Sequence, residues 1–159
     1  MAARDKRQRR CRGFTLIEAL VTMAVLVIVL SIAAPSFRAY TQAQRVKNAS
    51  FEFVAAMSYA RSEAIARRAN VVIAAQSDDF ANGWTITAGG TTLRQQGALG
   101  GVEVTASATS ITYGLDGRVE GAVTAMVKPL AGSGSTEKRC ISVDPTGMPR
   151  SRKTTATTC

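Results

Sequence analysis

The 159-residue sequence contains no histidine, and its cysteines are limited to Cys11, Cys140 and Cys159. Without histidine there is no imidazole to serve as a general base or as the centre of a catalytic triad. Dispersed cysteines without histidine do not form a zinc-binding pattern. No pair of carboxylates stands in a recognisable catalytic context. We therefore expect a non-enzymatic protein with no metal site and no cofactor.

Acidic residues are also scarce, since 11 Asp and Glu face 20 Lys and Arg, for a formal net charge of +9. This charge is uneven, because basic side chains crowd the residues before Gly13 and gather again between Lys138 and Lys153, where Asp144 is the only acid. Much of the 46% hydrophobic content lies in one N-terminal run. The rest of the chain can therefore form only one small globular domain.

Residues 19–37 carry no charged side chain and are long enough to cross a bilayer as a helix. The basic residues before this run predict a cytoplasmic N-terminus, with everything after Arg38 on the far side of the membrane. A secretory signal peptide is the alternative. Two features argue against it: Glu18 stands at the edge of the apolar run, and Pro35 directly follows the best small-residue cleavage site.

The helical pattern continues beyond this run, because residues 38–69 contain neither glycine nor proline. Apolar residues recur there at spacings that form one helix face. They are Val46, Phe53, Met57, Ala60 and Ala64. We interpret this stripe as core packing rather than a partner site. Pro35 predicts a bend or local melting of the helix near Ala34.

Residues 70–159 change to short apolar or alternating runs separated by glycine, which is typical of β-strands. Gly89-Gly90 and Asp116-Gly117 are typical of tight turns between strands. The sequence therefore predicts an α+β protein, in which one long helix packs on a small antiparallel sheet.

The motif Gly13-Phe14-Thr15-Leu16-Ile17-Glu18, followed by the apolar run, resembles the processing site of type IV prepilins and type II secretion pseudopilins. The resemblance implies that a prepilin peptidase cuts between Gly13 and Phe14 and that Phe14 is then N-methylated. Residues 1–13 would be a removed leader, and residues 14–37 a transmembrane and filament-core helix.

The same resemblance gives Glu18 a role in assembly. A carboxylate at membrane depth is costly without a positive partner. In a filament, the N-terminal amine of a neighbouring Phe14 would supply one. The alternative is that Glu18 only reaches towards the lipid headgroups.

Two stretches of the β-rich region, residues 82–86 and 111–119, resemble recurring segments of the GspH/FimT branch of minor pilins and pseudopilins. The resemblance implies a pilin-like fold for nearly the whole chain. Trp84 and Gly117, which belong to these stretches, are expected to serve as a core aromatic and a turn residue.

Cys140 and Cys159 are the cysteines of the part expected to be exported, where the environment is oxidising. A disulfide between them is the simplest interpretation. Free thiols or an intermolecular bridge are the alternatives.

A basic stretch lies inside the loop that such a bond would close. Arg150, Arg152 and Lys153 suit phosphate contacts, with Lys138 and Arg139 as further candidates. Some FimT-like minor pilins that support natural transformation bind DNA through a glycine followed by an Arg-x-Arg element; here two residues separate Gly147 from Arg150. No aromatic residue is interleaved with these cations, so binding to double-stranded DNA would be electrostatic and independent of sequence. A solvated basic terminus is the alternative.

These observations lead to one functional expectation with a close alternative. We expect a minor pilin of a type IV pilus, or else a GspH-like pseudopilin of a type II secretion system. The expected partners are other pilin or pseudopilin subunits, the prepilin peptidase and the inner membrane, with double-stranded DNA as a further candidate. The expected location is the inner membrane, then the periplasm or the cell exterior within a filament.

Overall fold

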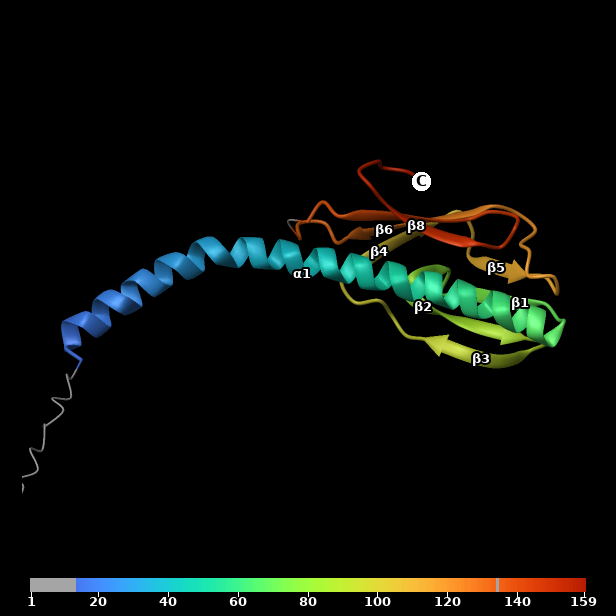
Figure 1. Ribbon diagram of the computed structural model, residues 1–159, viewed down its shortest axis with the longest axis horizontal. Helices are drawn as coiled ribbons and strands as arrows, with labels where there is room; N and C mark the ends of the chain where they lie inside the picture. Colours follow the sequence, from blue (N-terminus) through green and yellow to red (C-terminus); the bar gives the residue numbers. More distant parts are fainter. Residues whose placement is uncertain (1–13, 134) are drawn as a thin grey trace, which may run out of the picture. The chain divides into compact units, whose positions relative to one another are not determined.

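The structure, a computed structural model, describes residues 14–133 and 135–159 (Figure 1). The chain divides into two compact units, Met1–Ser36 and Phe37–Cys159. Helix α1, Leu16–Arg67, begins in the first unit and ends in the second. The expected leader, with Gly13 and Cys11, lies outside the described residues.

Helix α1 continues through Pro35. A proline removes one backbone hydrogen bond, and the remaining bonds of the adjoining turns keep this segment helical. The expected melting near Ala34 is therefore not observed.

Within the second unit, α1 buries one face and exposes the opposite one. Its buried residues include all members of the apolar stripe expected from the sequence. Phe53 lies at the centre of this face, with its ring centroid 4.7 Å from that of Phe80 and 5.2 Å from that of Trp84. The interpretation of the stripe as core packing is confirmed.

The first sheet has four antiparallel strands in the order β3-β2-β1-β5. Their bounds are Val71–Gln76 for β1, Asp79–Ala88 for β2, Thr91–Gln96 for β3 and Ser110–Tyr113 for β5. Ile73 and Ile86 lie opposite each other and are fully buried, so this face of the sheet belongs to the core.

The second sheet also has four antiparallel strands, in the order β4-β6-β7-β8. Their bounds are Val102–Ala106 for β4, Val123–Pro129 for β6, Lys138–Val143 for β7 and Pro149–Thr154 for β8. Buried residues such as Val127 and Ile141 mark its inner face. Its outer face carries the alternate residues of the same strands.

One core cluster joins side chains of α1 and of both sheets, and all its buried members lie between Val46 and Val143. The expected α+β fold, with a long helix packed on antiparallel strands, is confirmed. The expectation of one sheet is wrong, because the strands divide between two. Alternating residues indicate which face of a strand is buried, but not which strands pair.

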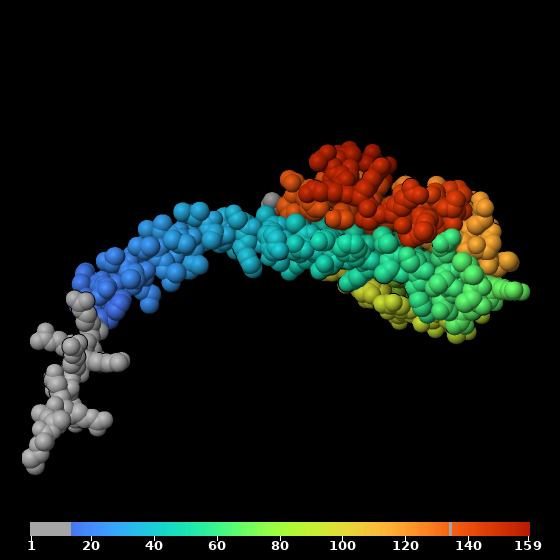
Figure 2. Space-filling view, viewed as in Figure 1, coloured from blue at the N-terminus to red at the C-terminus, as the bar shows by residue number. Residues whose placement is uncertain are grey.

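Strand β8 is a second difference from expectation, since residues 149–154 were expected to lie in a basic loop. Lys is depleted in strands, and Pro149 cannot donate to a ladder. Both are tolerated here because β8 is an edge strand and Pro149 is its first residue. The C-terminal residues, drawn in red, lie on the surface of the second unit (Figure 2).

Candidate functional site

The expected assembly residue Glu18 lies in the first turn of α1. Its backbone N–H donates to Thr15 Oγ1 at 3.3 Å, so Thr15 acts as the N-cap of the helix. Thr15 and Glu18 have the spacing of a capping box, in which the acid can reach back to the N-cap. The Glu18 side chain is exposed within the first unit.

The helix behind this turn is apolar on all sides. An 18-residue stretch of α1 is strongly apolar, and none of it is buried. Large apolar side chains such as Leu20, Val25 and Leu30 are each more than half exposed. A helix of this length and composition can span a membrane. An all-round apolar surface requires lipid or other helices to cover it.

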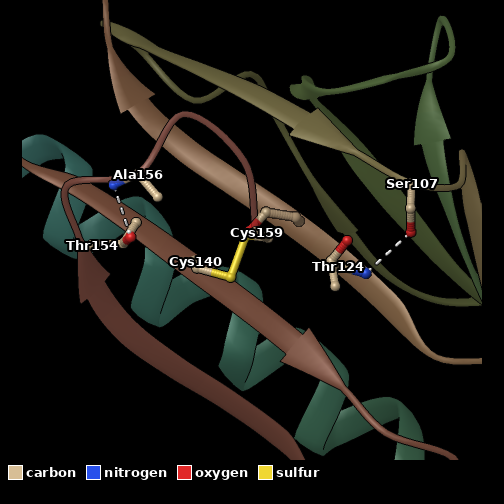
Figure 3. Close-up of a disulfide and its surroundings, with 7 residues drawn as sticks. Ser107, Thr124, Cys140, Thr154, Ala156 and Cys159 are labelled. Atoms are coloured by element: carbon tan, nitrogen blue, oxygen red, sulfur yellow. Dashed lines mark hydrogen bonds between the residues drawn. A yellow bond between two sulfur atoms is a disulfide. The ribbon is translucent and has the colours of Figure 1, made fainter.

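The structure joins Cys140 and Cys159 in a disulfide, with 5.5 Å between their Cα atoms (Figure 3). Cys140 belongs to β7, and Cys159 is reached by a tail, residues 155–159, that turns back over the outer face of the second sheet. The tail begins with a turn in which the Ala156 N–H donates to Thr154 Oγ1 at 3.1 Å.

The five candidate DNA-binding cations do not form one surface. Register places Arg139 opposite Lys153, on the face that carries Ile141. Arg152 lies opposite Cys140 and Arg150 opposite Ser142, on the outer face, which Lys138 shares by alternation. The structure thus assigns Lys138, Arg150 and Arg152 to the outer face, and Arg139 and Lys153 to the inner one.

The carboxylate of Glu137 forms ion pairs with both inner cations. Glu137 Oε2 is 2.5 Å from Lys153 Nζ, and Glu137 Oε1 is 3.7 Å from Arg139 Nε. The Glu137 side chain is only 14% exposed and that of Arg139 18%, so their pair is screened less than a surface pair, whereas Lys153 is 68% exposed. Arg139 and Lys153 are therefore poor candidates for phosphate contacts.

In the structure an aromatic ring lies beside basic side chains, although the basic stretch of the sequence contains no aromatic residue. The Phe51 ring is 53% exposed, and its centroid is 5.7 Å from Arg139 Cζ and 5.9 Å from Lys47 Nζ. In space, α1 brings Phe51 to the start of β7, beside Arg139, one of the five candidate cations. This ring belongs to the inner side, away from Arg150 and Arg152.

Arg61 was not singled out from the sequence, yet it connects three segments. Its Nε donates to the Gly117 carbonyl at 3.1 Å, and its Nη2 donates to the Thr146 carbonyl at 3.4 Å. A Cβ at Gly147 would overlap the Gly117 carbonyl oxygen, and Gly147 has a φ of 78°. The two turns therefore pack backbone to backbone beneath Arg61. Its partners are backbone atoms far away in sequence, which leave no sequence signal.

The Gly147 turn leads directly into β8. Hydrogen bonds from the Thr146 side chain and backbone lower the pKa of Asp144 below its ordinary value, with the charge of Arg150 as a smaller cause. Asp144 thus offsets part of the outer-face charge. Among the residues that the structure describes, there is no group of three or more His, Cys, Asp or Glu that could hold a metal ion.

Two family models match the sequence. One, described as type II transport protein GspH, covers residues 49–147. The other, the prokaryotic N-terminal methylation motif, covers residues 8–34. No curated protein matches the sequence. The GspH match ends before β8, so this strand and the C-terminal tail lie outside it.

Solved structures share the fold at low sequence identity. The type IV minor pilin FimU of Pseudomonas aeruginosa PAO1 aligns with 21% identity and a TM-score of 0.59, over 71% of this chain and 98% of the FimU chain. A second crystal form of FimU gives 23% identity and a TM-score of 0.58, over 72% and 92%.

The minor pseudopilin EpsH from the type 2 secretion system of Vibrio cholerae aligns with 16% identity and a TM-score of 0.55, over 69% of this chain and 97% of EpsH. The fold is thus that of minor pilins and pseudopilins, which are structural subunits. The N-terminal methylation motif and the apolar helix fit a pilin anchored in the inner membrane. Because the GspH match alone spans more than half of the chain, the protein belongs to the GspH family of pilin-like subunits.

Proposed function

We propose that the protein is a minor pilin of a type IV pilus, a non-enzymatic subunit that assembles with other pilins. The observation that supports a role as a filament subunit is the unburied apolar helix, most of which lies within the match to the methylation motif. Such a helix is unfavourable in water, but lipid can cover it before assembly and neighbouring helices can cover it afterwards. The domain of residues 37–159 would then be displayed outside the membrane.

Processing would prepare the helix for this exchange. A prepilin peptidase would cut between Gly13 and Phe14 and leave an N-methylated Phe14. The basic leader would hold the N-terminus on the cytoplasmic side until then. Glu18, one turn into the helix, would pair with the Phe14 amine of a neighbouring subunit, which offsets the cost of a carboxylate at membrane depth.

The alternative function is that of a pseudopilin in a type II secretion system. The likeness to EpsH and the description of the matching family favour it. Both functions use the same processing, anchor and fold, and they differ in the machine that the filament serves.

A gene deletion separates the two. Loss of surface pili with normal secretion of folded proteins is expected for a minor pilin. Loss of secretion with normal pili would overturn the proposal in favour of the pseudopilin. Restoration of the phenotype by the wild-type gene, but not by a Glu18→Ala gene, would tie either result to assembly rather than to a neighbouring gene.

DNA binding is a second candidate function, and it rests on the outer face of the second sheet. Lys138, Arg150 and Arg152 come from two adjacent strands of this face. Strand pairing already fixes the backbone of these cations, so only their side chains lose conformational freedom when they contact phosphates. We expect weak binding to double-stranded DNA, with little dependence on sequence.

A further inference from the structure

The last eleven residues contribute little to the hydrophobic core. No side chain of residues 149–159, all of which the structure describes, belongs to the core cluster. Every residue of β8 is at least partly exposed. The Ser151 Oγ atom is buried without a hydrogen-bond partner among the described residues. Apolar burial therefore does not hold this segment in place.

Three other connections hold it. The backbone of β8 pairs with β7 along its whole length, from Pro149 opposite Val143 to Thr154 opposite Lys138. Lys153 pairs with Glu137. The Cys140–Cys159 disulfide anchors the far end of the tail to the neighbouring strand. Of these, only the disulfide is covalent.

The tail covers part of the outer face of the second sheet. Cys140 is 2% exposed and Met126 is 5% exposed, although both point outward by the alternation of their strands. The tail also forms one side of an open hollow of about 400 Å³, lined by Thr105, Thr124, Met126, Lys128, Thr157 and Cys159, among others. Figure 3 shows the tail crossing above these strands to reach Cys140. Release of the tail would expose Met126 and Cys140.

We infer that β8 and the tail form one detachable unit and that the Cys140–Cys159 disulfide is its latch. A dithiol reductant, such as a thiol–disulfide oxidoreductase, breaks the latch by thiol exchange. The S–S bond gains two electrons and two protons to give two thiols, while the dithiol becomes a disulfide. The outer face then changes from covered to open while the core stays folded. This inference does not depend on the filament role or on DNA binding.

The expected size of the effect follows from chain entropy. The bond joins residues 19 positions apart, and closing a loop of this length shifts an opening equilibrium by on the order of 100-fold. The Lys153–Glu137 pair involves an exposed lysine and should change the same equilibrium by roughly 3-fold or less. The latch should therefore dominate.

Limited trypsin digestion of the full chain in detergent micelles tests this inference, because β8 carries cleavage sites after Arg150, Arg152 and Lys153. Samples are digested with and without dithiothreitol, quenched in acid, and then fully reduced, so that cut fragments separate in both. Cleavage in β8 should become on the order of 100-fold faster after reduction, since it follows the population of the open form. Cleavage after Arg61 in α1 and Arg94 in β3 should stay unchanged.

Two variants sharpen the test. Cys159→Ser should digest in β8 like the reduced wild type, and Lys153→Ala should digest at the remaining sites like the oxidised wild type. Reoxidation of the reduced wild type should restore protection, which separates release from misfolding. Equal rates in β8 before and after reduction would overturn the inference. Equal acceleration at Arg61 and Arg94 would also overturn it, because the disulfide would then hold the whole domain.

Discussion

Cys140 and Arg152 lie directly opposite each other in the pairing of β7 with β8, so the disulfide and the Arg152 side chain share the outer face of the second sheet. Arg139, one residue before Cys140, points to the other face, where it lies near Glu137 and the Phe51 ring. This alternation divides the basic side chains into an outer set and an inner set, and the inner set pairs with Glu137. The division decides which residues can meet a ligand.

The outer set should bind DNA and the inner set should not. Replacing Lys138, Arg150 and Arg152 by alanine in a 38–159 fragment should abolish binding to double-stranded DNA in a polarisation titration. A control triple variant, Lys47→Ala, Arg94→Ala and Lys153→Ala, loses the same charge elsewhere and should bind like the wild type. With three phosphate contacts, wild-type affinity should fall roughly as the third power of salt concentration. Equal losses in both variants would indicate only a response to net charge.

Glu18 should be needed for assembly but not for membrane insertion. Glu18→Ala should be processed normally, while its recovery in sheared filaments falls roughly 10-fold or more, because a neighbour's amine loses its partner. Glu63→Ala removes a helix acid that pairs with Arg67 and should assemble normally.

Glu18→Gln separates pairing from helix capping, because glutamine can complete a capping box but carries no charge. It should fail like Glu18→Ala. Normal assembly of this variant, measured by immunoblot of the filament fraction, would show that the cap matters and the charge does not.

The packing of the two turns beneath Arg61 predicts a large cost for a single methyl group. Gly147→Ala forces a left-handed residue and a clash with the Gly117 carbonyl, which should destabilise the 37–159 domain by about 2–4 kcal/mol. A Cβ at Gly97 would have no neighbour within 4 Å, and the φ of Gly97 is not left-handed. Gly97→Ala should therefore change stability little. Urea denaturation of both variants measures the difference, and equal midpoints would contradict the packing.

Tyr113 should make the domain sensitive to alkaline pH. Burial raises the pKa of Tyr113 to about 12, although the charge of Arg61 opposes the shift. Since the folded pKa exceeds the unfolded value of about 10, its contribution is complete below pH ~10 and is lost as pH rises towards 12. The loss should reach roughly 2 kcal/mol.

Tyr113→Phe should remove this loss, because phenylalanine cannot ionise. Tyr40→Phe, at an exposed site, should leave it unchanged. Urea midpoints of the 37–159 domain between pH 9 and pH 12 measure the effect. An equally steep fall in Tyr113→Phe would assign the sensitivity to other groups.

Much of the fold could be predicted, because the local spacing of apolar residues indicates the type of each element and which face of it is buried. The stripe from Val46 to Ala64 follows a helical period, so the sequence alone indicates which face of α1 is buried. Strand β1 could be located in the same way, from an apolar run that follows the end of the helix. The division into two sheets could not, because pairing between strands leaves no local pattern.

The site was harder to predict, because its contacts join distant residues. Arg61 bonds to Gly117 and Thr146, and Glu137, just before β7, pairs with Lys153 of β8. Strand β8 was missed because its proline and its cations suggest a loop, and only its place at a sheet edge makes them acceptable. The number of basic residues in a sequence therefore overstates the positive charge of the surface where folding brings an acidic side chain next to them.

Mass spectrometry of purified filaments tests the filament role most directly. We expect an N-terminal peptide that begins with N-methylated Phe14, and we expect the leader residues, Cys11 among them, to be absent. Protein that begins at Pro35, or that retains residues 1–13 in the membrane fraction and never enters filaments, would contradict it.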